Sequence, residues 1–484
     1  MSRFSCVPRL AVLALPMVFV FAVPARAATP VQAALAGATG PGDLRARLIA
    51  FANGAGKSDP NSAGEAWHWA GESWRRGAKP DSAIAAYRRA NALRGTFDDR
   101  YVLADALLAR QAPGDIDEAL KILQGSLPEA QSESHEVAVY YSALLAWGKL
   151  LAGDLEGSRN DFAGVERDIS RDPLWRYRSG RAALTGPDTP KAIQLLRPLA
   201  VASRGQAQDV MELLQHAAER VGQTEMLDQD LAARMQSRDQ IEERVVTAMQ
   251  GHRVKFASAD RFPLSGVLLE APGSGRHRVA IVMMAPEDTL ADFDSLAVAL
   301  RSSGLHTLLV AARGSGWSVG PSCPLPYSWE GREESLLRWT ARDAREAVRA
   351  TALATKADTS GYVLVVSRSL ALAGAEAAAT DKRVRALVLL SPNPDPVDRG
   401  ELVATLAKRK IPVFIQQTIE DFENAEITDA AYHASAESAS RVSDGHSGGH
   451  GAIAFKMDSR VTPRFRQWLA DALSASPRSQ PRKG

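Results

Sequence analysis

The stretch Tyr362–Leu372, YVLVVSRSLAL, decides how the second half of this 484-residue chain folds. Its apolar and mainly β-branched first half predicts a buried strand. The small residues around Arg368 indicate a turn, and the alanine-rich sequence beyond Leu370 favours a helix. Such a strand-turn-helix junction presents the side chain at its turn to solvent, and Ser369 stands there. We therefore ask whether Ser369 is a nucleophile or only a helix N-cap, a role that serine often has.

Apolar segments and helical segments alternate along the whole region after Gly251. This alternation, with strands that are apolar throughout, predicts a mostly parallel sheet covered by helices on both faces. Ligands of such sheets bind at the carboxyl ends of the strands. The expected strands are 264–270, 279–284, 307–311, 362–366, 386–390 and 413–416, and the expected helices are 293–303, 329–354 and 370–380.

Three further motifs accompany this pattern. They are ARGSGWS (312–318), IPVFI (411–415) and the glycine-rich loop SDGHSGGHGAIAF (443–455). With the Ser369 junction, they make residues 255–475 resemble the α/β-hydrolase family. The short connection between Leu390 and Ile411 leaves no room for a lid, so the layout is similar to lidless, dienelactone-hydrolase-like members. The resemblance implies an esterase-like serine hydrolase that needs no cofactor and no metal.

The resemblance also implies a catalytic triad in the chain order serine, acid, histidine. Ser369 would attack an acyl carbonyl, His450 would take its proton, and Asp421 would orient His450. Glu420 is the rival of Asp421, and His446 is the rival of His450 in the same loop.

Backbone N–H groups at Leu370 and Glu287 are the expected oxyanion hole. Pro286 has no N–H, so a donor position that fell on it would be lost. Ser367 and Ala371 occupy the positions where the family's elbow usually has glycines. These departures support an alternative, in which the domain is a catalytically inactive binding module that acts as an envelope scaffold.

Residues 62–223 show amphipathic helical patterns and almost no strand-like alternation. Small residues recur at Ala83, Ala119, Ser158 and Ala192, roughly 36, 39 and 34 positions apart, which is close to the period of helical-hairpin repeats. The first unit resembles a tetratricopeptide repeat (TPR), with Trp67, Gly71, Trp74, Ala83, Tyr87 and Ala90 at the motif's positions. Later units retain Leu107, Leu123, Leu145, Phe162, Gly180 and Leu196 at comparable points. An array of this kind predicts either a protein-binding face or a helical spacer.

The remaining segments complete the predicted organisation. Residues 1–28 have basic, apolar and small-residue regions in the order of a cleavable signal peptide, which predicts a periplasmic or secreted protein; an uncleaved anchor is the alternative. Residues 29–61 are expected to be a flexible linker, 224–254 a polar linker helix, and 476–484 a disordered tail. The near-zero net charge gives no sign of a nucleic-acid partner, and no membrane span is expected once the signal is removed. The expected substrate is a small-molecule or envelope-linked ester or acyl compound, with a possible protein partner on the helical array.

Overall fold

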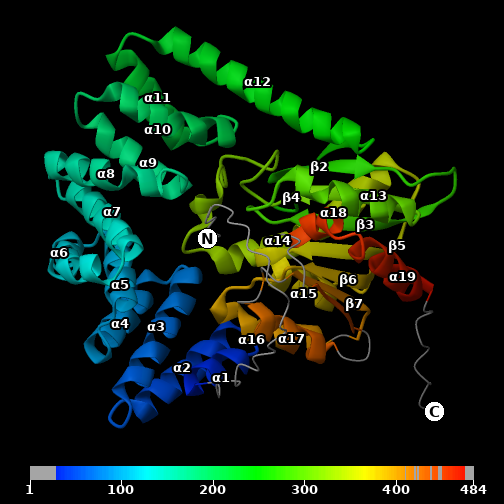
Figure 1. Ribbon diagram of the computed structural model, residues 1–484, viewed down its shortest axis with the longest axis horizontal. Helices are drawn as coiled ribbons and strands as arrows, with labels where there is room; N and C mark the ends of the chain where they lie inside the picture. The colour runs from blue at the N-terminus through cyan, green and yellow to red at the C-terminus, as the bar shows by residue number, and fades with distance from the viewer. Residues whose placement is uncertain are drawn as a thin grey trace, which may run out of the picture.

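The computed structural model describes residues 29–408, 410–418, 421, 424–435, 439–444 and 450–474. They form a curved array of helices followed by an α/β domain, and the array bends around one edge of the sheet (Figure 1). The predicted signal peptide (1–28) and the tail (476–484) lie outside the described residues. Among the described helices, none is both long enough and apolar enough to cross a membrane.

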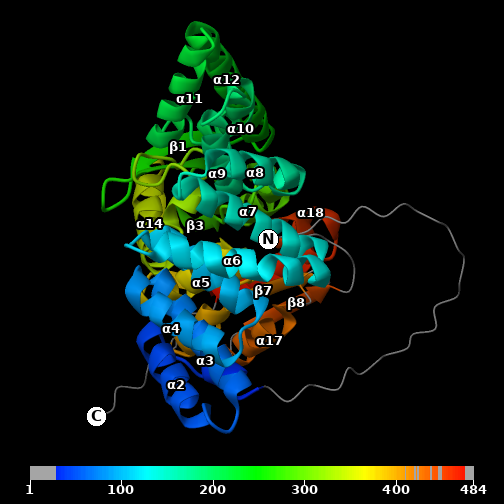
Figure 2. The same cartoon turned by 90° about the vertical axis from the view of Figure 1, so that its left-hand side faces the viewer.

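The array consists of helices that are joined by short turns and pack against their neighbours in the chain. Many begin with a proline in the first turn, where the missing N–H costs nothing, and several have an Asp, Ser or Thr N-cap. Each helix buries one apolar face against the next, and Figure 2 shows the outer side of the resulting curve. The helices are α1 (Pro30–Ala36), α2 (Pro41–Ala55), α3 (Pro60–Arg76), α4 (Pro80–Leu93), α5 (Phe97–Arg110), α6 (Asp115–Glu133), α7 (His135–Leu151), α8 (Leu155–Ile169), α9 (Pro173–Leu184), α10 (Thr189–Ala202) and α11 (Gln208–Arg220).

Helices α1 and α2 occupy residues that the sequence predicts to be a flexible linker. Thr29 and Gln32 form a capping box that starts α1. Val31 and Leu48 are fully buried in a cluster that also contains Val397 of the α/β domain. The segment is therefore part of the core, because Val31, Leu35, Leu44, Leu48 and Ala52 are all buried.

Two hairpins of the array pack in the same way, with a glycine on one helix facing a large side chain on the next. A Cβ atom at Gly71 of α3 would overlap the ring of Tyr87 on α4. At Gly180 of α9 a Cβ atom would lie 2.7 Å from Leu196 Cγ on α10. Glycine is required at both places because the facing helix carries a large side chain that fills the space.

The α/β domain contains a sheet of eight described strands in the order β1-β2-β4-β3-β5-β6-β7-β8, which is the strand order of the α/β-hydrolase fold. β1 and β2 pair antiparallel, β2 is antiparallel to β4, and the other pairs are parallel. The sequence prediction missed the two edge strands, β1 and β8. The bounds are β1 (His252–Ala257), β2 (Pro263–Leu269), β3 (His277–Met284), β4 (Leu305–Ala311), β5 (Ala357–Ser367), β6 (Val384–Leu390), β7 (Val413–Thr418) and β8 (Ala439–Asp444).

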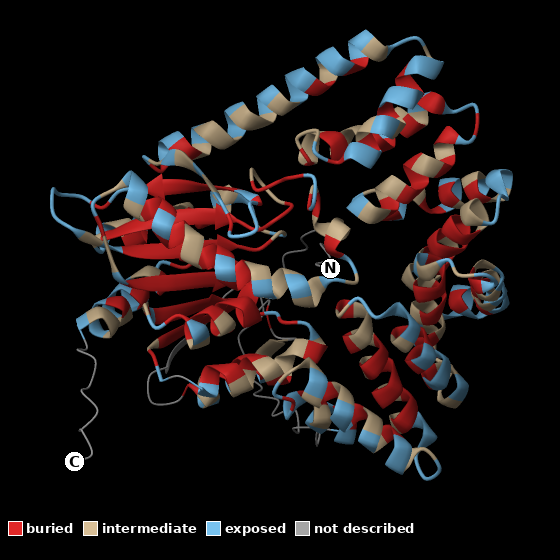
Figure 3. Ribbon diagram, turned by 180° about the vertical axis from the view of Figure 1, so that it is seen from behind, coloured by how far each residue is buried: buried red, intermediate tan, exposed pale blue. Residues whose placement is uncertain are grey.

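Helices cover both faces of this sheet, whose central strands are buried (Figure 3). α13 (Asp294–Ser302), α18 (Ala454–Met457) and α19 (Val461–Ser474) pack in one apolar cluster with one face. α14 (Glu333–Ala354), α15 (Ala371–Thr380), α16 (Arg399–Ala407) and α17 (Ala425–Ala434) belong to the cluster on the other face. The fold is thus the predicted helical array followed by an α/β domain with a mostly parallel sheet.

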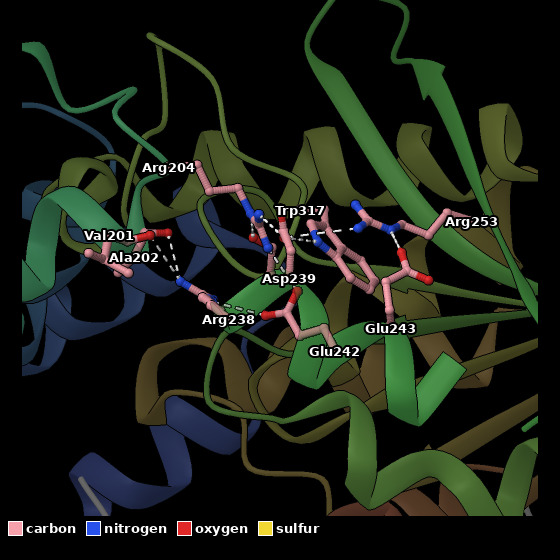
Figure 4. Close-up of polar contacts among 10 residues, drawn as sticks. Val201, Ala202, Arg204, Arg238, Asp239, Glu242, Glu243, Arg253 and Trp317 are labelled. Carbon is pink, nitrogen blue, oxygen red and sulfur yellow. Dashed lines mark hydrogen bonds and ion pairs between the residues drawn. The ribbon is translucent and has the colours of Figure 1, made fainter. Parts of the chain in front are cut away.

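The long helix α12 (Thr224–Ala248) does more than link the two parts. Trp317, in the loop after β4, donates from Nε1 to Asp239 of α12 at 3.2 Å (Figure 4). The Arg253 guanidinium lies 4.1 Å from the centre of the Trp317 ring. Arg204, which follows α10, forms an ion pair with Asp239 and donates to the Gly316 carbonyl at 3.1 Å. The polar face of this predicted linker helix therefore ties the array to the α/β domain.

Candidate active site

Asp421 and His450 meet at the carboxyl edge of the sheet. Asp421 follows β7, its side chain is 4% exposed, and its Oδ1 lies 2.6 Å from His450 Nδ1. A buried carboxylate at Nδ1 favours the tautomer with its proton on that nitrogen, which leaves Nε2 as the basic atom. The His450 side chain is 36% exposed, so Nε2 belongs to a ring that solvent and a substrate can reach. Glu420 and His446, the alternatives for these roles, lie outside the described residues.

Three hydrogen bonds hold the second oxygen of Asp421. Its Oδ2 accepts from Ser391 Oγ at 2.6 Å, from Thr418 N–H at 2.9 Å and from Thr418 Oγ1 at 3.1 Å. Ser391 Oγ also accepts the Gly451 N–H at 2.7 Å. Because Gly451 is adjacent to His450, Ser391 connects the acid to the backbone of the histidine loop. The sequence analysis did not identify Ser391, although the signal was present in a serine directly after a buried strand.

Ser369 lies at the start of α15, in the short helical turn η3 (Arg368–Leu370), and its side chain is exposed. Its Oγ is 3.3 Å from Glu287 Oε2, and its N–H is 3.5 Å from Glu287 Oε1. Within the described residues, no hydrogen bond joins Ser369 to His450. The structure thus brings Asp421 and His450 into contact, whereas Ser369 contacts Glu287 instead.

The backbone strain of the junction falls on Arg368. In a nucleophile elbow the strained residue is the nucleophile itself. Here Ser367 is extended, with φ −111° and ψ 147°, and Arg368 has φ 49°. The Arg368 Nε lies 3.5 Å from Glu287 Oε1. The turn is therefore made one residue before Ser369, which the small-residue pattern alone did not reveal.

The loop after β3 differs from a simple oxyanion hole. Ala285 N–H is already used, because it donates to Asp288 Oδ2 at 2.8 Å and to Ser367 Oγ at 3.0 Å. Glu287, whose N–H was the expected donor, places its carboxylate against Ser369. A carboxylate there opposes a developing negative charge electrostatically. Leu370, the other expected donor, directly precedes α15, whose N-terminal dipole favours an anion.

Asp288 is a component of the site that the sequence analysis did not identify. Its carboxylate accepts a hydrogen bond from Ser367 Oγ. Burial raises the pKa of Asp288 to about 6, the Ser367 hydrogen bond opposes this shift, and the negative charge of Glu287 adds to it. An acid in the loop directly after a buried strand was the available signal.

A cavity of about 370 Å³ adjoins this loop. Pro286 and Asp288 line it from the α/β domain, and Ala202 and Arg238 line it from the array and α12. The sequence predicts a lidless and open site, but the helical array and α12 supply a wall over this edge of the sheet. Cys323 is fully buried in a cluster with Phe262, Leu264 and Trp329, and burial raises the pKa of its thiol to about 11.

No protein-family profile matches the chain, and no curated protein sequence matches it. Similar solved structures include the acylaminoacyl peptidase of Pyrococcus horikoshii, at 12% identity and a TM-score of 0.36, covering 48% of this chain and 42% of the peptidase. A 2,6-dihydroxy-pseudo-oxynicotine hydrolase matches at 12% identity and a TM-score of 0.37, over 64% of this chain and 88% of its own. An esterase of Pyrococcus furiosus matches at 12% identity and 0.36, over 46% and 94%. These values say nothing about activity, and the fold assignment rests on the strand order of the sheet.

Proposed function

We propose that the protein is a periplasmic or secreted serine hydrolase that cleaves ester or acyl bonds without a cofactor. The observation that carries this proposal is the contact between Asp421 and His450, in which a buried carboxylate fixes a solvent-accessible imidazole at the carboxyl edge of the sheet. That carboxylate receives four hydrogen-bonding contacts, which compensate its burial and fix the position from which it orients the imidazole.

In the proposed reaction Ser369 Oγ attacks the acyl carbonyl, and its proton passes to His450 Nε2. His450 then gives that proton to the leaving oxygen or nitrogen, and a water molecule repeats the sequence to release the acid. Asp421 stabilises the imidazolium that forms in each half. Ser369 must leave Glu287 and turn toward His450 in the substrate complex, where catalytic hydrogen bonds often tighten.

The test uses a short p-nitrophenyl ester as substrate. We expect Ser369→Ala and His450→Ala each to lower kcat at least about 10³-fold, because they remove the nucleophile and the base. His446→Ala should retain wild-type turnover. Equal activity of wild type and Ser369→Ala would contradict the assignment.

A second candidate is a catalytically inactive binding module, and the position of Arg368 favours it. Arg368 holds the strained position of the junction, and its partner Glu287 blocks Ser369. Labelling with a fluorophosphonate and mapping the modified peptide separates the two. An adduct on Ser369 that is lost in His450→Ala supports the hydrolase, whereas a folded protein without an adduct supports the binding module.

We further propose that the array is a divergent set of TPR-like hairpins that presents its concave side to a ligand or a protein partner. Its support is the recurrence of one packing device, Gly71 against Tyr87 and Gly180 against Leu196, in two hairpins far apart in the chain.

A further inference from the structure

A second and larger cavity, of about 920 Å³, lies between the concave side of the array and the α/β domain. Helices α5, α7 and α9 line it on one side. The short helix η2 (Pro326–Trp329) and the start of α14 line it on the other. Figure 1 shows α14 beginning opposite these array helices. The cavity exists only because both parts of the chain contribute walls.

The charged side chains of this cavity are strongly unbalanced. Arg178 is its only basic lining residue among those that the structure describes. The acidic lining residues are Asp98, Asp105, Glu136, Asp172, Glu330 and Glu333. A cavity whose wall carries one sign of charge concentrates ions of the opposite sign.

The cations already in the neighbourhood do not neutralise this wall. Arg178 pairs with Asp105 at 3.4 Å, and Arg75 pairs with Glu333 Oε1 at 3.1 Å. The other oxygen of Glu333, Oε2, is buried and has no hydrogen-bond partner. Among the residues that the structure describes, the Glu330 carboxylate forms no hydrogen bond and no ion pair, although its residue is exposed to the cavity. Two carboxylate groups therefore retain unused acceptor capacity.

Aromatic rings supply much of the remaining wall. Tyr101 and Trp175 line the array side, and Tyr327 and Trp329 line the opposite side. Aromatic faces attract cations, and a guanidinium already uses this property here, since Arg178 lies 4.6 Å from the centre of the Trp175 ring. Aromatic faces combined with carboxylates are suited to an ammonium or guanidinium group on an apolar body.

We propose that this cavity binds an organic cation, an ammonium or guanidinium group carried on an apolar body, with Glu330 as the principal counter-charge. The cavity adjoins the smaller one at Pro173 and Pro326, which line both. The proposal does not depend on Ser369 being a nucleophile.

The binding should depend on pH through Glu330. Partial desolvation by the cavity wall raises the pKa of Glu330 to about 7, although the residue keeps exposed surface; Asp105 of α5 and Glu333 of α14 add to this, and Arg178 of α9 and Arg75 of α3 oppose it. A cation binds the ionised carboxylate, so affinity should fall as the pH falls from 8 to 6. In Glu330→Gln this change should be absent.

The experiment is isothermal titration of the full chain with benzyltrimethylammonium and, separately, with Nα-benzoyl-argininamide. The neutral Nα-benzoyl-norleucinamide is the matched ligand control. We expect each cation that binds to do so at least about tenfold more tightly than the neutral compound. Glu330→Gln should weaken that binding about tenfold, and the exposed-surface variant Glu212→Gln should leave it unchanged. Preference for the first ligand indicates a quaternary ammonium compound, and preference for the second indicates a guanidinium group borne on a peptide.

Two results would overturn the proposal. One is that neither cation binds, at millimolar concentration, to a protein shown by circular dichroism to be folded. The other is that the neutral compound or Glu330→Gln gives the same affinity as the cation with the wild type. Tyr327→Leu gives an independent check, since loss of the ring should weaken binding of the cation while Glu330 remains intact. Because Ser369→Ala should bind the cation as the wild type does, failure of this proposal is distinguishable from failure of the hydrolase assignment.

Discussion

Two carboxylates at the carboxyl edge of the sheet have opposite surroundings. Asp421 is buried among donors, from Ser391, Thr418 and the His450 ring. Asp288 is also largely enclosed, but it stands beside the negative charge of Glu287, and its pKa is raised to about 6. The carboxylate of Asp421 is thus surrounded by hydrogen-bond donors and orients His450, whereas the surroundings of Asp288 favour its protonated form.

This difference predicts the effect of Asp288→Asn on stability. An aspartate in the unfolded chain has a pKa near 3.9. Between roughly pH 4 and 6 the folded protein holds a proton on Asp288 that the unfolded chain has released, so the free energy of unfolding falls as pH rises through this window. Asparagine carries no charge, so the variant should exceed the wild type by about 2 kcal/mol above pH 6, with the difference closing toward pH 4.

Urea unfolding at pH 4.5 and at pH 8 measures this difference. Asp228→Asn, at an exposed position beyond the first turn of α12, is the control and should change the free energy of unfolding by less than about 0.5 kcal/mol at either pH. An Asp288→Asn variant that is destabilised equally at both pH values would show that the folded protein does not favour the protonated form of Asp288.

At the scale of the element, close helix contact in the array depends on single glycines. Tyr87 is fully buried, and its hydroxyl donates to Glu72, so its ring cannot move aside for a new side chain at Gly71. We expect Gly71→Ala to lower the free energy of unfolding by about 1–3 kcal/mol, because overpacking forces the two helices apart. Gly164→Ala on α8, where a Cβ atom meets nothing within 4 Å, should raise it by about 0.5–1 kcal/mol.

Guanidinium unfolding followed by circular dichroism compares these two variants. The same chemical change should have opposite signs at the two positions. If Gly71→Ala were neutral or stabilising, α3 and α4 would not be packed as closely as the Gly71 contact implies.

The sequence predicts an element well when the element depends on a local pattern, and poorly when it depends on contacts with distant residues. The strand and helix on either side of Ser369 follow from local periodicity, and so does the close packing at Gly71. The sequence analysis missed the edge strands β1 and β8 because an edge strand buries less apolar surface and therefore shows a weaker apolar pattern. The sequence analysis also missed helices α1 and α2, because their burial depends on a partner, Val397, that lies more than 300 positions away in the sequence.

The candidate site divides in the same way. The pairing of Asp421 with His450 follows from motif order, since both residues lie in loops that the resemblance identifies. The contact of Glu287 with Ser369 and the strain at Arg368 depend on which backbone torsions the junction adopts. A pattern of small residues does not determine these torsions. The main evidence against Ser369 as a nucleophile is therefore the strained backbone of Arg368 and the contact with Glu287, rather than the missing glycines at Ser367 and Ala371.

At the scale of the whole molecule, the array is held on the α/β domain at both of its ends. Trp317 and Arg204 make the contact near α12, and Arg76 of α3 makes the contact near α16. Arg76 donates to Asp395 at 2.6 Å and forms an ion pair with Asp398. Both cavities lie between these attachments, so their shape depends on the array remaining docked.

The Arg76 contact predicts how the array detaches. The Arg76 side chain is 8% exposed and that of Asp398 is 13% exposed. Burial raises the pKa of Asp398 to about 7, Arg76 opposes this shift, and Asp395 and Glu401 add to it. Arg76→Ala removes the cation from both carboxyl groups, and Asp398 then takes up a proton rather than staying charged, so we expect a cost of about 1–3 kcal/mol. That cost falls on the docked state, so α1–α3 should open locally before the rest unfolds.

Hydrogen exchange measured by mass spectrometry detects such opening directly. In Arg76→Ala, exchange should accelerate in residues 30–76 and 395–407 and stay unchanged in β3 and β5, whose packing does not involve Arg76. Arg88→Ala, which breaks the more exposed pair with Glu118, should cost less than about 1 kcal/mol and leave both regions protected. Uniform acceleration over the whole chain in Arg76→Ala would mean that array and sheet unfold as one unit, and that the cavities between them cannot open without global unfolding.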